Sequence, residues 1–486
     1  MPPGPVKVVF LDLLGLPLQR PVVASAKLPP RQTLKDVFSS DIWHGYECGR
    51  FTEEETCRKI SARYSLDVAD VDDSTRDEEH EHEHEHLIDS LQSLKAKAEA
   101  DGDGILCGML NIPKPEYTAI QGRMAGWVLF NHVFISCQLG MRKPDLCFYR
   151  HVLRELGQSD SPEALLFVET DAENVLPARS IGSCVVLHTG INETLRSLQN
   201  FLGNPVARGK EFLRVNAKHL HSVTSTGVVI RDNFTQLLVL EATGDRELVY
   251  LEEHPRSWNF FIGKPLLTTR AYPDDFDTTA VALTVLEPPA AQVLQSVLDE
   301  MASHVSTDGI ILTYFDATRP RIDPVVCLNV LTLFHKHGRG HELPNTLSWV
   351  RDVLQHREYI YGTCYYATPE IFLYSLARLL ESTSRSEMGI PGHDDFVFLL
   401  RERVAEHVGL PGDALALAMR LLAARYVGIA DAVDAERLRE MQCEDGGWES
   451  AWVYQYGKTD VRIGSRGLAT ALAVKALSGH GDSGKE

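Results

Sequence analysis

The pattern of apolar residues changes near residue 200, and this change constrains the fold more than any other feature of the chain. Before it, short and fully apolar runs at residues 8–11, 133–135 and 165–168 alternate with segments long enough to form helices. Uninterrupted runs of this length are typical of parallel strands that are buried on both faces of a sheet. The first part of the chain is therefore predicted to be an α/β domain.

After about residue 207 the apolar residues recur with helical spacing instead. Val326, Val330, Leu333 and Phe334 follow the i, i+4, i+7, i+8 pattern of one helix face, and further segments repeat this pattern. Loops rich in Gly, Pro and Asp separate these segments. We therefore expect an α/β domain over residues 1–203 and an all-α domain over residues 207–480.

Bulk properties limit the class of partner. The 486-residue chain carries a formal net charge of −19, which argues against binding to nucleic acid or to an anionic membrane surface. It has no run of about 18 apolar residues, so no membrane span is expected. Nine scattered cysteines without a CxxC pair favour reduced thiols in a cytoplasmic protein. Because the apolar N-terminal stretch contains Asp12 and lacks a small-residue cleavage site, we interpret it as a buried strand and not as a signal peptide.

Several segments of the first part share a pattern with one hydrolase family. The segments RKPD at residues 142–145 and ENVLPARSIG at residues 173–182 resemble those of haloacid dehalogenase-like hydrolases. Residues 40–55 resemble the helical cap of the branch that contains the phosphatase half of soluble epoxide hydrolases. The resemblance covers about residues 6–200 and implies a dehalogenase-like parallel sheet with a helical cap.

This resemblance implies roles that the chain fills only in part. Asp12 matches the nucleophile that attacks phosphorus, whereas Leu14 stands where the general acid should be. Leu110 stands where a Thr or Ser should bind the phosphoryl group. Leucine can neither donate a proton nor form a hydrogen bond through its side chain. Loss of the general acid alone is expected to slow hydrolysis by roughly 10²- to 10⁴-fold.

The remaining positions of the hydrolase site are better matched. Lys143 matches the phosphate-binding lysine. Glu169 and Thr170 stand where two acidic residues are usual, with Asp171 adjacent, so Asp12, Glu169 and Asp171 are the predicted ligands of Mg²⁺. Two interpretations stay open, an attenuated phosphatase that acts on a diphosphate and a structural domain with an inactive site. The missing groups favour the second.

In the second part, the segment DDFDTT at residues 274–279 carries the first chemical signal. Asp and Thr are favoured where a helix begins, because their side-chain oxygens accept hydrogen bonds from free backbone N–H groups. The alternative is an extended conformation, in which Asp275 and Asp277 lie on one side and face the same cavity. The segment alone leaves both conformations open.

A second motif, QCEDGGW at residues 442–448, resembles the Gln–Trp signature of terpene cyclase α-barrels. In that signature the Gln ties helix ends together and the Trp packs between helices. With DFDTT, it resembles class II terpene cyclases, in which an Asp-x-Asp-Thr-Thr motif protonates an alkene. The whole chain, with the cyclase likeness over about residues 207–480, is similar to the drimane-type sesquiterpene synthases of fungi and some bacteria.

The resemblance implies a reaction and a set of site residues. Asp277 is expected to protonate the terminal alkene of farnesyl diphosphate, and Asp275 with Thr278 or Thr279 is expected to orient it. The implied product has a drimane-type bicyclic skeleton. Burial keeps a carboxylic acid neutral, and a neighbouring carboxyl favours one protonated partner. Roughly three to five aromatic side chains are expected to line the cavity and stabilise the carbocation.

The diphosphate is not the leaving group in this chemistry, so it needs a binding site. Lys458 and Arg462, four residues apart after the QCEDGGW loop, are the predicted pair. The product is expected to be released still phosphorylated, and the alternative is a bifunctional enzyme whose first domain hydrolyses the diphosphate. A single helical barrel also needs its cavity closed, either by the first domain or in a homodimer.

Two further hypotheses belong to other functional classes. The first is a dehalogenase-type hydrolase whose helical part only binds substrate or a partner, and Leu14 and Leu110 count against it. The second is an interaction protein without activity, and the intact DFDTT segment counts against it.

Overall fold

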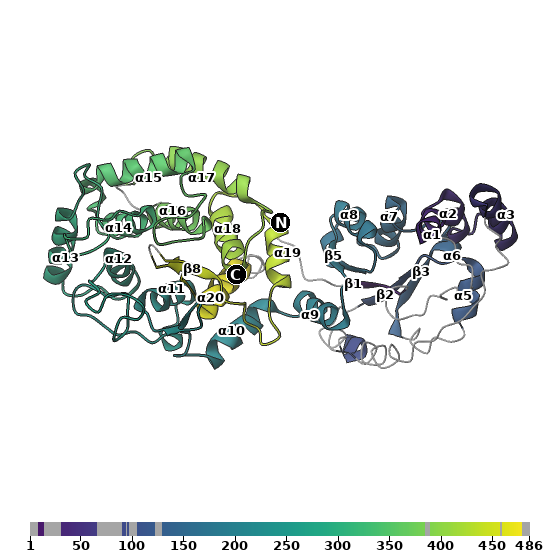
Figure 1. Ribbon diagram of the computed structural model, residues 1–486, viewed down its shortest axis with the longest axis horizontal. Helices are drawn as coiled ribbons and strands as arrows, with labels where there is room; N and C mark the ends of the chain where they lie inside the picture. The colour runs from purple at the N-terminus through teal and green to yellow at the C-terminus, as the bar shows by residue number, and fades with distance from the viewer. Residues whose placement is uncertain are drawn as a thin grey trace. The chain divides into compact units, whose positions relative to one another are not determined.

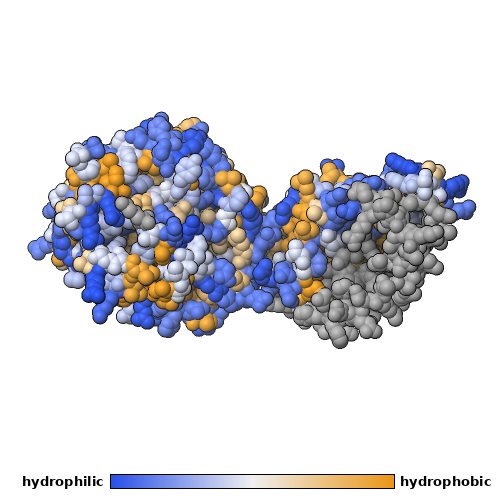
Figure 2. Space-filling model, viewed as in Figure 1, coloured by the Kyte–Doolittle hydropathy of each residue, from blue (hydrophilic) through white to orange (hydrophobic). Residues whose placement is uncertain are grey.

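The computed structural model describes residues 8–13, 31–65, 90–93, 95–96, 105–121, 129–383, 389–456 and 459–478. The chain forms two compact units that divide between Gly203 and Asn204. None of the described helices is long and apolar enough to cross a membrane. On the face shown in Figure 2, hydrophilic residues dominate the surface of the larger unit and apolar residues gather in small separate groups.

The first unit is built on a five-stranded parallel sheet with the order β3-β2-β1-β4-β5. Its described elements are β1 (Val8–Asp12), α1 (Arg31–Phe38), α2 (Asp41–Glu47), α3 (Glu53–Tyr64), β2 (Ile105–Leu110), α5 (Lys114–Gln121), β3 (His132–Ile135), α6 (Ser136–Leu139), α7 (Leu146–Glu155), β4 (Leu165–Glu169), α8 (Ala172–Ser180), β5 (Cys184–Leu187) and α9 (Ile191–Leu202). The predicted α/β class and the buried N-terminal strand are confirmed, because all five residues of β1 are buried.

Apolar side chains cover both faces of this sheet, which explains the uninterrupted apolar runs of its strands. On one face, Val8 and Phe10 of β1 pack with residues of α7 and α8. On the other face, Val9 and Leu11 pack with residues of α9. Helix α2 and the start of α3 lie in the segment that resembles a cap, and α2 contacts both α1 and α3. The carboxyl ends of β1 and β4 are adjacent, so Asp12 and Glu169 are brought to one edge of the sheet.

The second unit is a helical barrel. Its helices are α10 (Pro205–Val215), α11 (Asn233–Thr243), α12 (Phe276–Val285), α13 (Ala291–Ser303), α14 (Pro324–Lys336), α15 (Pro344–His356), α16 (Glu370–Thr383), α17 (His393–His407), α18 (Ala414–Tyr426), α19 (Ala432–Glu440) and α20 (Arg466–Ser478). The helices α11, α12, α14, α16, α18 and α20 contact one another in a closed ring. Figure 1 shows α13, α15, α17 and α19 outside this ring. The predicted α/α-barrel is therefore confirmed.

The polarity of these helices follows their place in the barrel. In α14, which belongs to the inner ring, every residue from Val325 to His335 is buried, and the helix is apolar all round apart from a few polar residues. In α15, which lies outside, only one face is buried. Helices of the inner ring are enclosed on all sides, whereas the outer helices have one face in water.

Short strands and bridges gather the segments that lead into the inner helices. A four-stranded sheet has the order β7-β6-β9-β8, with β6 (Ser222–Thr224), β7 (Val229–Ile230), β8 (Trp452–Gln455) and β9 (Arg462–Gly464). Isolated bridges join Asp275 to Tyr314 and Tyr366 to Tyr454. Since these residues precede α12, α14, α16 and α20, the N-terminal ends of the inner helices meet at one end of the barrel, and the candidate site lies there.

Candidate active site

The DFDTT segment forms the start of helix α12. Asp275 is the extended N-cap residue, with φ −124° and ψ 152°, and its carboxylate accepts hydrogen bonds from the Thr278 backbone N–H (2.6 Å) and hydroxyl (3.0 Å). Asp277 is the second residue of the helix. Of the two conformations that the sequence allowed, the helix start is therefore the one observed, because Asp275 satisfies N–H groups that have no partner within the helix.

Two side chains from other segments hold the Asp277 carboxyl group. The Asn329 side-chain amide of α14 donates to Oδ1 at 2.7 Å, and the Tyr366 hydroxyl hydrogen-bonds to Oδ2. Asp277 is only 8% exposed and Tyr366 only 2%. The sequence analysis missed both direct partners as such, although a lone Asn in the apolar run of α14 is a signal that could have pointed to Asn329.

The contacts of Asn329 fix the orientation of its side-chain amide. The Arg378 guanidinium of α16 donates to the amide oxygen of Asn329 at 2.8 Å and forms an ion pair with Glu241 of α11 at 2.6 Å. Because arginine can only donate, the Asn329 amide must turn its NH₂ group toward Asp277. Oδ1 therefore accepts from the Asn329 amide, while Oδ2 accepts from the Tyr366 hydroxyl.

Burial makes both carboxyl groups of the motif weak acids. Burial raises the pKa of Asp277 to about 7, and the hydrogen bonds from Tyr366 and Asn329 act in the opposite direction. Burial also raises the pKa of Asp275 to about 8, although the hydrogen bonds from Thr278 oppose it. Asp277 is therefore neutral in a large fraction of molecules near pH 7, and its carboxylate form is stabilised by two hydrogen bonds once the proton has left.

The two threonines of the motif support the backbone and not the Asp277 carboxyl group. Thr278 binds Asp275, as described above. The Thr279 hydroxyl accepts a hydrogen bond from the backbone N–H of Trp258 at 2.9 Å, which ties the segment before α12 to the helix. No hydrogen bond to Asp277 is recorded for Asp275, Thr278 or Thr279, so orientation of Asp277 by these residues acts through the backbone of α12.

A series of aromatic ring contacts begins at Tyr366, the hydrogen-bond partner of the acid. The ring of Tyr366 lies 5.6 Å from that of Tyr454 and 6.4 Å from that of Phe234. Tyr454 in turn lies 5.6 Å from Phe260, which is 4.9 Å from Phe261. Further ring contacts continue through Tyr272, Tyr314 and Tyr365. Such faces can stabilise a nearby positive charge, each by roughly 0.5–2 kcal/mol.

The Gln–Trp motif has the arrangement that its signature implies. The Gln442 side-chain amide donates to the backbone oxygens of Pro205 (2.9 Å) and Gly446 (2.8 Å), so it links the start of α10 to the motif loop. The fully buried Trp448 donates from Nε1 to the Leu438 oxygen of α19 at 2.7 Å. An ion pair between Arg466 and Asp445, at 2.9 Å, joins α20 to the same loop.

The structure describes only one residue of the pair that is predicted to bind the diphosphate. Lys458 lies outside the described residues. Arg462 is exposed at the start of β9, where its backbone N–H donates to the hydroxyl of Ser225 at 3.1 Å.

In the first unit, the residues of the hydrolase-like site cluster at the carboxyl edge of the sheet. Lys143 Nζ lies 3.1 Å from Asp12 Oδ2 and 2.8 Å from Glu169 Oε2, and all three side chains are buried. Burial alone would lower the pKa of Lys143, but Asp12 and Glu169 outweigh it and raise the pKa. The Thr170 hydroxyl donates to Asp12 Oδ2 at 2.6 Å. The structure thus brings together Asp12, Lys143 and Glu169.

The expected metal ligands have other contacts in this structure. Glu169 is fully buried, and its oxygens contact Lys143, Asn174 (3.1 Å) and the Tyr149 hydroxyl (3.4 Å). Asp171 instead caps α8 by accepting a hydrogen bond from the Glu173 N–H at 2.9 Å. No group of three His, Cys, Asp or Glu residues that could hold a metal occurs among the described residues. That Asp12, Glu169 and Asp171 bind Mg²⁺ stays a prediction from the sequence.

The structure describes one of the two positions at which leucine replaces a hydrolase group. Leu110, at the end of β2, is fully buried and provides no hydroxyl group. Leu14 lies outside the described residues. The Thr170 hydroxyl contacts Asp12 where the resemblance calls for an acidic residue.

Known proteins show the same combination of units. The family model of the sesquiterpene cyclase astC-like C-terminal domain matches residues 206–337. Drimenol cyclase drtB of Aspergillus calidoustus is 43% identical over 475 residues, which cover 98% of this chain and 88% of that protein. The sesquiterpene phosphatase astK of Aspergillus oryzae is 27% identical over 175 residues, 35% of this chain and 86% of that protein. The type II terpene cyclase MstE from Scytonema is 13% identical with a TM-score of 0.42, covering 57% of this chain and 97% of that one.

The similarity to drimenol cyclase drtB extends through both units, and an identity of 43% over 98% of the chain establishes membership of one family. The chain therefore belongs to the drimane-type sesquiterpene synthases, in which a dehalogenase-like domain precedes a class II terpene cyclase domain.

Proposed function

We propose that this enzyme cyclises farnesyl diphosphate to a drimane-type bicycle by protonating its terminal alkene. The observation that carries the proposal is the buried Asp277 carboxyl group, held by Asn329 and Tyr366, with a pKa raised by burial to about 7. An aspartic acid side chain in water would be ionised near pH 7 and could not donate a proton. The name of the relative drimenol cyclase drtB points to the same bicyclic skeleton.

The first step transfers the proton from the Asp277 carboxyl group to the terminal alkene. The C–H bond forms as the O–H bond breaks, and the positive charge moves to the more substituted alkene carbon. Two successive attacks by the remaining alkenes close the two rings, and loss of a proton from the bicyclic cation completes the isomerisation. Asn329 and Tyr366 stabilise the Asp277 carboxylate that remains.

The residues around the acid favour this reaction over quenching by water. The side chains of Asp277, Tyr366 and Tyr454 are each at most 8% exposed, which keeps water from the cation. The rings of Phe234 and Tyr454 contact the ring of Tyr366, and Tyr454 in turn contacts Phe260. Their faces stabilise the cation as it moves along the chain.

The product is proposed to leave the enzyme still phosphorylated. Leu110 supplies no phosphoryl-binding hydroxyl group, and Glu169 is fully buried against Lys143 and Asn174. The alternative is a bifunctional enzyme that also hydrolyses the diphosphate. The retained Asp12–Lys143 pair, at 3.1 Å, is the observation that favours this alternative.

Several finer predictions accompany this proposal. Lys458 and Arg462 remain the pair predicted from the sequence to bind the diphosphate. A requirement for Mg²⁺, a homodimer that closes the cavity, and a cytoplasmic location also stay predictions. The isoprenoid diphosphate is the partner on which the proposed reaction depends.

One experiment separates the proposal from its alternative. The purified protein is incubated with farnesyl diphosphate and Mg²⁺, half of the sample is treated with alkaline phosphatase, and both organic extracts are analysed by gas chromatography and mass spectrometry. A bicyclic alcohol that appears only after phosphatase treatment supports the phosphorylated product. The same alcohol without treatment supports the bifunctional enzyme, and the absence of any bicycle contradicts both.

A further inference from the structure

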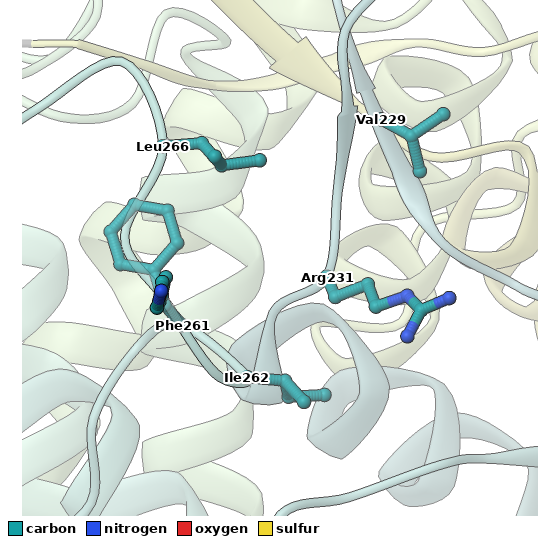
Figure 3. A pocket seen from close by; sticks show the side chains of 6 residues that line it. Val229, Arg231, Phe261, Ile262 and Leu266 are labelled. Atoms are coloured by element: carbon teal, nitrogen blue, oxygen red, sulfur yellow. The ribbon is translucent and has the colours of Figure 1, made fainter.

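A cavity with two basic residues opens in the cyclase unit near the segment that precedes α11. It has a volume of about 260 Å³ and is lined by Val229, Arg231, Phe261, Ile262, Lys264 and Leu266. Figure 3 shows Phe261 and Leu266 across the hollow from Val229 and Arg231, with Ile262 at its base in this view. The hollow thus combines an apolar wall with two cationic side chains.

Local backbone pairing places the segments that carry the two cations side by side. The segment after β7 pairs with the segment around Phe261 through the antiparallel bridge between Asp232 and Phe261, and the Ile262 N–H donates to the Arg231 oxygen at 2.9 Å. Side chains alternate along extended segments, so Val229 and Arg231 share one side while Asp232 turns into the core. The exposure pattern agrees, since Val229 and Arg231 are exposed and Asp232 is buried.

The loop that carries Lys264 is fixed at two points. The backbone N–H of Gly263, whose φ of +74° is readily adopted by glycine, donates to the Glu252 carboxylate. The Tyr456 hydroxyl, next to β8, donates to the Leu266 oxygen at 2.7 Å. Lys264 is therefore presented from a loop whose backbone is held on both sides of it.

The charges of Arg231 and Lys264 are not neutralised within the described part of the chain, where no ion pair to a carboxylate is recorded for either residue. Other arginines of the same unit do have acidic partners, for example Arg319 with Asp316 (3.1 Å) and Arg466 with Asp445 (2.9 Å). In a chain of net charge −19, two neighbouring cations without carboxylate partners form a local site that favours an anion.

Aromatic contacts connect this cavity to the acid. Phe261 of the cavity wall contacts Phe260, Phe260 contacts Tyr454, and Tyr454 contacts Tyr366 at ring distances of 4.9, 5.6 and 5.6 Å. Tyr366 hydrogen-bonds to Asp277. An apolar chain that lies along these rings would have one end at the acid and the other at the two cations.

We propose that Arg231 and Lys264 bind the diphosphate of the isoprenoid substrate at the mouth of this cavity. The inference rests on the proposed cyclisation and adds these two residues to the diphosphate site predicted from the sequence. A separate, exposed site for the polyanion is physically favourable. A diphosphate next to Asp277 would add negative charge there and would bring water to a carbocation that must stay dry.

Steady-state kinetics of the full-length protein with farnesyl diphosphate tests the assignment. Arg231→Gln and Lys264→Gln are each expected to raise KM about tenfold, with kcat within threefold of wild type, because each removes one charge-assisted contact and leaves the acid in place. Arg231→Lys should restore most of the loss. The matched control is Arg401→Gln, an exposed arginine on the outer helix α17, which should leave KM within twofold.

Inorganic pyrophosphate provides a second readout that does not need turnover. Calorimetric titration should show binding to the wild type and at least tenfold weaker binding to the Arg231→Gln/Lys264→Gln double variant. Unchanged KM and unchanged pyrophosphate affinity in the double variant would overturn the inference. If the wild type forms no bicycle, the proposed function fails, and the pyrophosphate titration still decides between a real anion site and none.

Discussion

Asp277 can act as an acid only because its surroundings oppose ionisation without leaving the carboxylate unsupported. Burial raises its pKa to about 7, while Tyr366 and Asn329 stabilise the charged form and limit the rise. Complete desolvation without these donors would give a carboxyl group too weak to protonate an alkene. The burial of Asp277 therefore keeps the proton available, and the hydrogen bonds from Tyr366 and Asn329 set the strength of the acid.

The pH dependence of cyclisation follows from the raised pKa of Asp277. The active form is the protonated one, so kcat should be highest at low pH within the stable range and should fall as pH rises through about 7. Tyr366→Phe removes a hydrogen bond that favours the carboxylate, so the alkaline limb should move to higher pH while maximal kcat falls roughly 10- to 100-fold. A pH–rate profile of both proteins measures this. A limb that stays in place or moves to lower pH contradicts the assignment.

Asn329 should affect the chemical step and not substrate binding. Asn329→Leu removes the donor to Asp277 Oδ1 and leaves Arg378 without the amide oxygen, so kcat should fall about 10- to 100-fold with KM within threefold. Thr332→Val is the matched control on the same buried helix, since its hydroxyl only contacts the Leu328 oxygen. Equal effects of the two substitutions would mean that packing of α14, and not the hydrogen bond, matters.

What could be predicted at the residue scale has a clear physical limit. Asp275, Asp277 and their threonines are contiguous, so a motif identifies them. Asn329 and Tyr366 lie 52 and 89 positions from Asp277 and meet it only because α12, α14 and the segment before α16 converge in the barrel. Likewise, the sequence did not show that Lys143 and Asn174, 26 and 5 positions away, both hydrogen-bond to Glu169.

At the scale of elements, the spacing of apolar residues predicted barrel helices such as α14 and the strands β1, β3 and β4, but it did not single out β2. The conformation of the DFDTT segment could not be settled in the same way, because its Asp residues suit both a helix start and a catalytic motif. The structure shows that both apply, since Asp275 caps α12 while Asp277 lies in its first turn. The closing of the inner ring by contact between α11 and α20 depends on residues that are far apart in sequence.

The Gln–Trp motif should contribute to stability and not to chemistry. Gln442→Ala removes hydrogen bonds to the oxygens of Pro205 and Gly446, which should lower the free energy of unfolding by about 1–3 kcal/mol. The thermal midpoint followed by tryptophan fluorescence should drop, while kcat at low temperature stays within threefold. Gln355→Ala, at an exposed position of α15, should change stability by less than about 0.5 kcal/mol. A similar loss in both variants would contradict a structural role for the motif.

At the scale of the whole molecule, one unit carries the intact acid and the other carries an incomplete hydrolase site. The order of these units could be predicted because the spacing of apolar residues differs between them. Whether the first unit acts on the product could not, since Asp12 and Lys143 are present while Leu110 replaces the phosphoryl-binding hydroxyl group.

If the first unit is a structural domain with an inactive site, loss of Asp12 should not change the product. Asp12→Asn in the full-length protein should leave the rate of cyclisation within twofold and the product phosphorylated, as in the wild type. Phosphate release and product extracts with and without alkaline phosphatase measure this. Release of phosphate by the wild type that Asp12→Asn abolishes would show that the unit is a working phosphatase.

The central claim is that Asp277 delivers a solvent-derived proton to the terminal alkene of farnesyl diphosphate. Mass spectrometry of the product formed in D₂O tests it most directly, with wild type and Asp277→Asn compared at equal concentration. The account predicts that the wild-type bicycle carries one deuterium, in the ring methylene next to the gem-dimethyl carbon, and that Asp277→Asn forms no bicycle. A bicycle without this deuterium, or wild-type turnover by Asp277→Asn, would contradict it.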